Sequence, residues 1–333
     1  MQTFTAQDLN TDGENGADAN TAEVVAAANA FLDTLDESTK ESVTYDFSDN
    51  ESRQTWSNFP TQTVPRMGVS LTDLDDTSRA AALALVETMS SEQGYEQVEA
   101  IRAADDWLNQ NSADGNDAFG ADVDYNIALF GEPSETDPFM VQFGGHHLAR
   151  NYTYLGTTAS ITPAFSGTEP KTFTSGDETI EPLKEKATTA FAVFDSLTDE
   201  QLATAQLTTT VDDILMGPGV DSGEFPETAG IQVSSLSADQ QQLVQAAIQA
   251  WVGDANSDLA ASFMSTYESQ LDETYVAYAN SDTVDGESTY LRIDGPRVWI
   301  ELVNTRSRST PDLHYHGVYR DKNDDYGSTN PSS

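Results

Sequence analysis

Two segments of the chain read as a strand, a glycine-containing turn and a second strand: Phe139-Met140-Val141-Gln142-Phe143-Gly144-Gly145-His146-His147-Leu148 and Tyr290-Leu291-Arg292-Ile293-Asp294-Gly295-Pro296-Arg297-Val298. Gly-Gly and Asp-Gly between apolar runs are strong signals for tight hairpin turns. We therefore predict two β-hairpins, with strands at 139–143 and 146–155 in the first and at 290–293 and 297–303 in the second. An isolated hairpin is only marginally stable in water, so both are expected to join one sheet.

Each hairpin ends a longer unit, because the chain repeats itself. Upstream of the hairpins, Gly68-Val69-Ser70-Leu71 reads against Gly230-Ile231-Gln232-Val233. Both segments lead into apolar positions at helical spacing, which align at one constant offset: Ala82, Leu85, Val86 and Met89 with Val244, Ala247, Ile248 and Trp251. Helices followed by strands in each half predict an α+β fold of two pseudo-symmetric halves that share one sheet.

The repeat divides the chain into five parts. Residues 1–21 are expected to form a disordered acidic arm and residues 328–333 a polar tail. The first helix-plus-hairpin repeat spans 22–165, a connecting segment spans 166–182, and the second repeat spans 183–327. Ser237 with Gln240, and Thr198 with Gln201, predict capping boxes at two helix starts of the second repeat. The alternative is two separate domains with 166–182 as the linker.

Composition excludes several classes of function. The 333 residues include 56 acidic and 15 basic side chains, for a net charge of −41, and 38% hydrophobic residues, enough for a core. The charge excludes nucleic-acid partners and opposes binding to anionic membranes. No cysteine is present, which excludes disulfides, thiolate catalysis and iron–sulfur clusters.

The sequence predicts a soluble protein, because no apolar run approaches the roughly 20 residues that would insert into a membrane. Residues 1–23 show no signal peptide, although a secreted or periplasmic protein whose leader had been removed would look the same. The dispersed acidity is typical of adaptation to salty, halophilic conditions. An acidic surface that recruits divalent cations is the alternative interpretation.

The four histidines occur as two pairs, His146-His147 and His314-Tyr315-His316. On a strand, residues i and i+2 share a face, so His314 and His316 should point the same way, whereas His146 and His147 should point to opposite faces. The repeat places His147 on a polar face, and we assign it to the site with His314 and His316. His146 is kept as a further metal-ligand candidate with a supporting or structural role. Convergent imidazoles suit a divalent transition metal, with zinc, iron and copper not distinguishable.

Four charged residues near these histidines are candidates for catalysis: Glu301, Arg297, Arg320 and Asp321. Either carboxylate could be a fourth metal ligand or a general base, and either arginine could hold an anionic substrate or developing charge. The competing interpretation is ordinary hydrogen bonding of strand histidines and a polar turn after the last strand. We expect the site in a polar cleft between the two repeats.

Three functions fit this pattern. The first is a metal-dependent hydrolase acting on a small-molecule or anionic substrate. The second is a secreted or periplasmic protein that binds a small ligand or metal without turnover, and the third is a structural envelope protein. An open coordination position in a cleft would favour the enzyme.

Several segments together resemble a bacterial family, domain of unknown function 3500 (DUF3500). They are Arg66-Met67-Gly68-Val69-Ser70-Leu71, Phe143-Gly144-Gly145-His146-His147-Leu148-Ala149, Gly167-Thr168-Glu169-Pro170, Asp294-Gly295-Pro296-Arg297-Val298-Trp299-Ile300-Glu301, and His314-Tyr315-His316 through Arg320-Asp321 to Asp324-Asp325-Tyr326-Gly327. The resemblance covers most of the chain after about residue 22, with Thr168 where the family often has alanine. It implies that these segments belong together and implies no activity.

Overall fold

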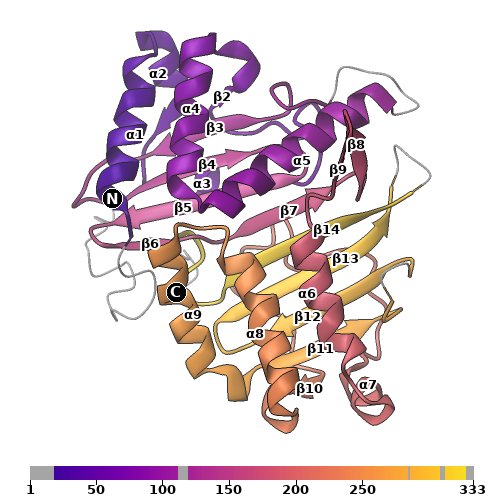
Figure 1. The fold of residues 1–333 in the computed structure, drawn as a ribbon. Helices are drawn as coiled ribbons and strands as arrows, with labels where there is room; N and C mark the ends of the chain where they lie inside the picture. The colour runs from indigo at the N-terminus through magenta and orange to yellow at the C-terminus, as the bar shows by residue number, and fades with distance from the viewer. Residues whose placement is uncertain (1–18, 112–118, 284–285, 308–311, 328–333) are drawn as a thin grey trace.

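The computed structural model describes residues 19–111, 119–283, 286–307 and 312–327, and it shows a mixed α+β fold with its long helices packed on one face of a large sheet (Figure 1). The predicted arm at 1–21 and tail at 328–333 fall almost entirely outside these residues. The described helices are α1 (Thr21–Asp33), α2 (Glu37–Val43), α3 (Asn50–Arg53), α4 (Asp76–Met89), α5 (Glu92–Asn111), α6 (Lys184–Asp195), α7 (Asp199–Ala205), α8 (Ala238–Val252) and α9 (Ser257–Ser269). The two predicted capping boxes are present, at the starts of α7 and α8.

The strands of the main sheet are β1 (Thr44–Tyr45), β2 (Val69–Ser70), β3 (Asn126–Phe130), β4 (Phe139–Gly144), β5 (Leu148–Leu155), β6 (Thr158–Ser160), β7 (Ala164–Thr168), β10 (Ile231–Gln232), β11 (Tyr275–Ala279), β12 (Thr289–Asp294), β13 (Val298–Arg306) and β14 (Leu313–Asp321). Their order is β1-β3-β4-β5-β7-β14-β13-β12-β11-β10, with β2 beside β3 and β6 beside β5. The β1–β3 pair is parallel, and the other pairs in the sheet are antiparallel.

Strand β7 lies between β5 and β14 and so joins the two hairpins into the one sheet that was predicted. The segment 166–182, expected to be a connection, therefore begins inside the sheet with the last residues of β7. It continues into a separate two-stranded sheet of β8 (Phe173–Ser175) and β9 (Glu178–Ile180).

Both predicted hairpins are present, but each turn lies further along the chain than expected. The β4–β5 ladder runs to the pair Gly144 and Ala149, and residues 145–147 form the turn between the end of β4 and the start of β5 at Leu148. Likewise, the β12–β13 ladder runs to Asp294 and Trp299, and residues 295–297 form the turn. The placement of His146 and His147 on a strand was therefore wrong: both lie in a turn, where alternation between faces does not apply.

Successive side chains along each strand point to opposite faces of the sheet, and the two faces are covered differently. Residues such as Phe143, Ile300 and Tyr319 pack beneath the helices in the main hydrophobic core. Their strand neighbours Phe165 and Val318 pack on the opposite face, in a second cluster with residues from loops: Phe47, Trp56, Met216 and Tyr326. His314 and His316 share the strand face of Val318 and so belong to the loop-covered side.

None of the helices within the described ranges is long and apolar enough to cross a lipid bilayer.

Candidate metal centre

Three imidazoles converge where the β4–β5 turn meets β14. The Nε2 atoms of His314 and His316 lie 3.0 Å apart, and one ring nitrogen each of His147, His314 and His316 lies within 4.8 Å of the others. All three side chains are buried. Two ligands bound to one ion at about 2.1 Å lie roughly 3.0–3.4 Å apart for bond angles between a right angle and tetrahedral. The group could therefore hold a metal ion.

Backbone pairing brings His147 to this place. The N–H of Gly167 donates to the carbonyl of His147 at 2.7 Å, which extends the β5–β7 ladder into the turn. On its other side Gly167 pairs with His316 of β14. A Cβ on Gly167 would lie 2.8 Å from Cδ2 of His147, so glycine at this position leaves room for the ring.

Two carboxylates orient the rings of His316 and His147 by contacting their Nδ1 atoms. Oδ1 of Asp213 lies 2.9 Å from Nδ1 of His316, and Oδ1 of Asp105, on α5, lies 3.3 Å from Nδ1 of His147. A carboxylate at Nδ1 keeps the proton on that nitrogen and leaves the Nε2 lone pair free for a metal. Nε2 of His147 is buried and has no hydrogen-bond partner.

Burial also fixes the charges at the site. It lowers the pKa of His147 to about 4, with His146 adding repulsion, and together with His316 it lowers the pKa of His314. Burial opposes ionisation of Asp105, yet the adjacent rings of His146 and His147 hold the pKa of this carboxyl below its usual range. At neutral pH His147 and His314 therefore offer neutral imidazoles beside the ionised carboxylate of Asp105, the protonation states that metals require.

His146 takes part in a second group. Ligand atoms of Asp105, His146 and His147 lie within 4.8 Å of one another. The His146 ring stacks on Phe119 at a centroid distance of 5.0 Å and lies 3.7 Å from the His147 ring. The expectation that His146 would face away from His147 was wrong, because neither residue lies within the β4–β5 ladder, where alternation between faces would apply.

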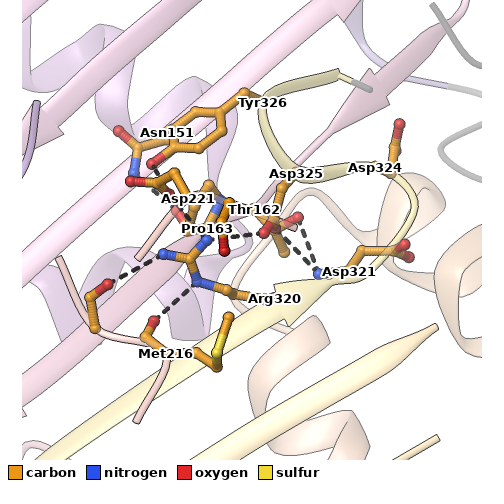
Figure 2. Close-up of polar contacts among 12 residues, drawn as sticks. Asn151, Thr162, Pro163, Met216, Asp221, Arg320, Asp321, Asp324, Asp325 and Tyr326 are labelled. Carbon is orange, nitrogen blue, oxygen red and sulfur yellow. Dashed lines mark hydrogen bonds and ion pairs between the residues drawn. The ribbon is translucent and has the colours of Figure 1, made fainter. Parts of the chain in front are cut away.

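Two of the four predicted catalytic residues hold the loop that carries Asp213. The Glu301 carboxylate accepts the backbone N–H groups of Leu215 at 2.9 Å and Met216 at 3.0 Å. Arg320 donates from Nε to the carbonyl of Met216 at 2.9 Å. Figure 2 shows the Arg320 guanidinium between Met216 and two carboxylates, Asp221 and Asp325, each 3.0 Å from it.

The other two form an ion pair near the end of β14. Nε of Arg297 lies 3.0 Å from Oδ1 of Asp321, whose second oxygen accepts the hydroxyl of Tyr267 at 2.8 Å. At about 3.3 Å per residue, Asp321 lies roughly 16 Å along the strand from His316. The structure thus brings the four histidines together and places Arg297, Arg320 and Asp321 toward the other end of β14. Glu301 pairs with Val318, closer to the histidines.

Sequence reasoning missed Asp105 and Asp213. Asp105 lies 42 residues before His147 and Asp213 lies 103 residues before His316. Neither aspartate belongs to a motif, and 56 acidic residues offer no way to choose them. Only the fold pairs them with histidines.

Comparison with curated proteins and with solved structures gave no match. Residues 17–328, nearly the whole chain, match the family described as "Protein of unknown function (DUF3500)". That range contains the histidine turn, Gly167 and the His314-Tyr315-His316 strand, and the chain belongs to the DUF3500 family.

Proposed function

We propose that this protein binds a divalent transition-metal ion through Nε2 of His147, His314 and His316. The observation that carries the proposal is the unpartnered Nε2 of His147, which is wholly buried beside the other two rings. A buried polar atom without a partner costs about 1–3 kcal/mol, and a shared ion would supply the missing interaction. The contact between Asp213 and His316 supports it further, because metal-bound histidines usually carry such a carboxylate on the other nitrogen.

The chemistry that the centre favours is metal-assisted hydrolysis. Three imidazoles leave a coordination position for water or substrate, and zinc, iron and copper all accept such ligands. When bound, the ion would supply Lewis acidity. The chain itself would orient the rings through Asp105 and Asp213 and would limit water access by packing Phe165 against His316, at a centroid distance of 5.6 Å.

In this proposal Glu301, Arg297, Arg320 and Asp321 are positioning residues. Glu301 and Arg320 bind the backbone of the loop that presents Asp213. The pair formed by Arg297 and Asp321 joins the β12–β13 turn to β14. None of these roles requires contact with a substrate.

A binding protein without turnover is the second candidate, and one observation favours it. The residues His146, His147, His314 and His316 are at most 8% exposed. So little access for a substrate suits storage or transport of an ion better than it suits catalysis.

We also propose that residues 22–165 and 183–327 are two copies of one unit, joined by 166–182, with a pseudo-twofold axis between β7 and β14. The strand order supports this, since β3-β4-β5-β7 and β14-β13-β12-β11 mirror each other outward from that point. The turns match as well: Gly145 donates to the carbonyl of Leu148 and Gly295 to that of Val298, both at 2.8 Å. His147 and Arg297 then occupy equivalent turn positions.

Elemental analysis of the purified protein tests the metal proposal. The double variant His314→Ala/His316→Ala should lose the ion bound by the three histidines, whereas Asp212→Asn, an exposed change in the same loop as Asp213, should keep it. Equal metal content in the double variant and the wild type, or no binding by either after incubation with zinc or copper, would contradict the proposal.

A spectroscopic test separates enzyme from binding protein. In the cobalt-loaded protein, azide should shift the visible spectrum if a coordination position is open to small molecules. An unchanged spectrum would favour a closed binding site.

A further inference from the structure

The two carboxylates behind the histidines are not alike. Asp213 lies 2.9 Å from His316, the length of an ordinary charge-assisted hydrogen bond, about 2.7–2.9 Å. Oδ1 of Asp105 faces two imidazoles at longer range, 3.3 Å from Nδ1 of His147 and 3.7 Å from Nδ1 of His146. These separations are closer to those between neighbouring ligands of one ion, roughly 3.0–3.4 Å, than to those of strong hydrogen bonds.

The burial and the contacts of the Asp105 carboxylate also favour a bound cation beside it. The side chain is wholly buried, and its Oδ2 accepts the hydroxyl of Tyr125 at 2.6 Å. Within the described parts of the chain, the ion-pair partners of Asp105 are the rings of His146 and His147, and no lysine or arginine pairs with it. A buried carboxylate without a lysine or arginine partner is a suitable ligand for a cation.

The imidazole ring of His146 also presents a possible ligand atom to Asp105. Nδ1 of His146 is buried and has no hydrogen-bond partner. Phe119 and His147 pack on its ring, so the ring is held in place without using this nitrogen. The atom that faces Asp105 is therefore free to bind a ligand.

Building on the proposed three-histidine centre, we propose a second divalent transition-metal site formed by Asp105, His146 and His147, with the ring of His147 bridging the two ions. Nε2 of His147 binds the first ion beside His314 and His316. Nδ1 of His147 binds the second ion and releases its proton to solvent as it does so. Borderline ions such as Cu(II) and Zn(II) accept both imidazole and carboxylate ligands and fit this donor set.

The bridge explains why the four histidines of the chain lie together. His147 alone contributes to both groups: its Nδ1 faces Asp105, and its Nε2 has no hydrogen-bond partner. Asp213 serves only the first centre, through His316. Removing His146 should therefore empty the second site and leave the first intact.

The test uses the full chain, stripped of metal, loaded with excess Cu(II) in 0.5 M NaCl and passed over a weak chelating resin that removes ions from surface carboxylates. Copper per chain is then measured, together with the intensity of the copper EPR signal. The wild type should hold two ions whose EPR signal is mostly lost, because two Cu(II) ions bridged by an imidazole ring couple antiferromagnetically. His146→Ala should hold one ion with full EPR intensity, and Asp212→Asn, an exposed change that leaves every proposed ligand in place, should still hold two.

The outcomes are distinct. One ion in both the wild type and His146→Ala would overturn the second site and leave the three-histidine centre standing. No retained copper in the wild type would refute the proposed function itself. Two ions with full EPR intensity would refute the bridge. Circular dichroism and thermal melting establish that His146→Ala is folded, and Asp105→Asn, which preserves side-chain size, should give the same loss of one ion if His146→Ala is not.

Discussion

Gly167 pairs with His316 across β7 and β14, and the space left by its missing side chain is filled by the ring of His147. Three strands are involved, because Gly167 also donates its N–H to the carbonyl of His147. One glycine therefore sets the separation of two of the three imidazoles. The Gly167-Thr168-Glu169-Pro170 segment gains a physical role from this contact.

Replacing Gly167 by alanine should weaken metal binding. The new Cβ would lie 2.8 Å from Cδ2 of His147 and 3.0 Å from the carbonyl of Tyr315, so the His147 ring must move. Overpacking of this kind typically costs about 1–3 kcal/mol of stability. Calorimetric zinc titration and urea unfolding measure both effects. The control is Gly156→Asn, at φ +57° with open space around the Cβ, where asparagine is tolerated. Wild-type zinc affinity in Gly167→Ala would contradict the role given to this glycine.

Replacing Asp213 by asparagine should lower metal affinity without removing a ligand. Its Oδ1 lies 2.9 Å from Nδ1 of His316 and keeps the proton there. Loss of such a partner typically costs about 10–100-fold in metal affinity. The matched control is Asp212→Asn, one residue away and exposed, which should bind zinc as the wild type does. Equal zinc dissociation constants for the two variants would show that Asp213 does not orient His316.

The hairpins could be predicted from sequence because Gly-Gly and Asp-Gly mark turns between apolar strands. The turn positions were displaced because the ladders continue through Gly144 and Asp294, which sequence alone does not reveal. That small displacement had a chemical consequence: it moved His146 out of the strand and next to His147. The grouping of the histidines followed from spacing, whereas Asp105 and Asp213 arrive through contacts between distant segments.

The sequence predicts a catalytic role for Glu301, and the contacts of this residue support the positioning role that we propose instead. Its buried carboxylate accepts from Leu215, Met216 and the hydroxyl of Tyr290 at 2.8 Å. In Glu301→Gln one acceptor becomes an NH₂ group that faces donors, so we expect a loss of about 1.5–3 kcal/mol in the free energy of unfolding. Metal affinity should fall as well, because the Asp213 loop loses its anchor. Both are measured by urea unfolding and zinc titration.

The control for Glu301 is Glu224→Gln, an exposed change on the same long loop. A Glu301→Gln protein with unchanged stability and zinc affinity would show that this carboxylate is not a positioning residue. Loss of a hydrolytic activity in that same protein would instead place Glu301 in catalysis.

Asp325 should make stability depend on pH between about 4 and 6. Burial raises the pKa of Asp325 to about 6, even though Arg320 lies 3.0 Å away and favours the charged form. The folded state thus holds this proton more tightly than the unfolded chain, whose pKa is about 3.9. The stabilisation is fully present below about pH 4 and is lost as pH rises through about 6, a change of about 3 kcal/mol. Asp325→Asn should have a shallower slope than wild type in urea unfolding over this range, and the exposed change Asp272→Asn should not. Parallel slopes for Asp325→Asn and wild type would refute the assignment.

The net charge of −41 should make the fold more stable as salt increases. Carboxylates spread over the chain repel one another in the compact state, and salt screens this repulsion over a Debye length of about 10 Å at 0.1 M and about 3 Å at 1 M. The melting midpoint, followed by circular dichroism at pH 7.5, should therefore rise with NaCl and level off once the Debye length falls below the spacing of neighbouring charges. At pH 4, where many carboxylates carry protons, the same salt series should produce a smaller rise. A midpoint that is flat or falls with salt at pH 7.5 would show that charge repulsion is not a major strain on this fold, and an equal rise at both pH values would attribute the effect to exclusion of salt from the protein surface.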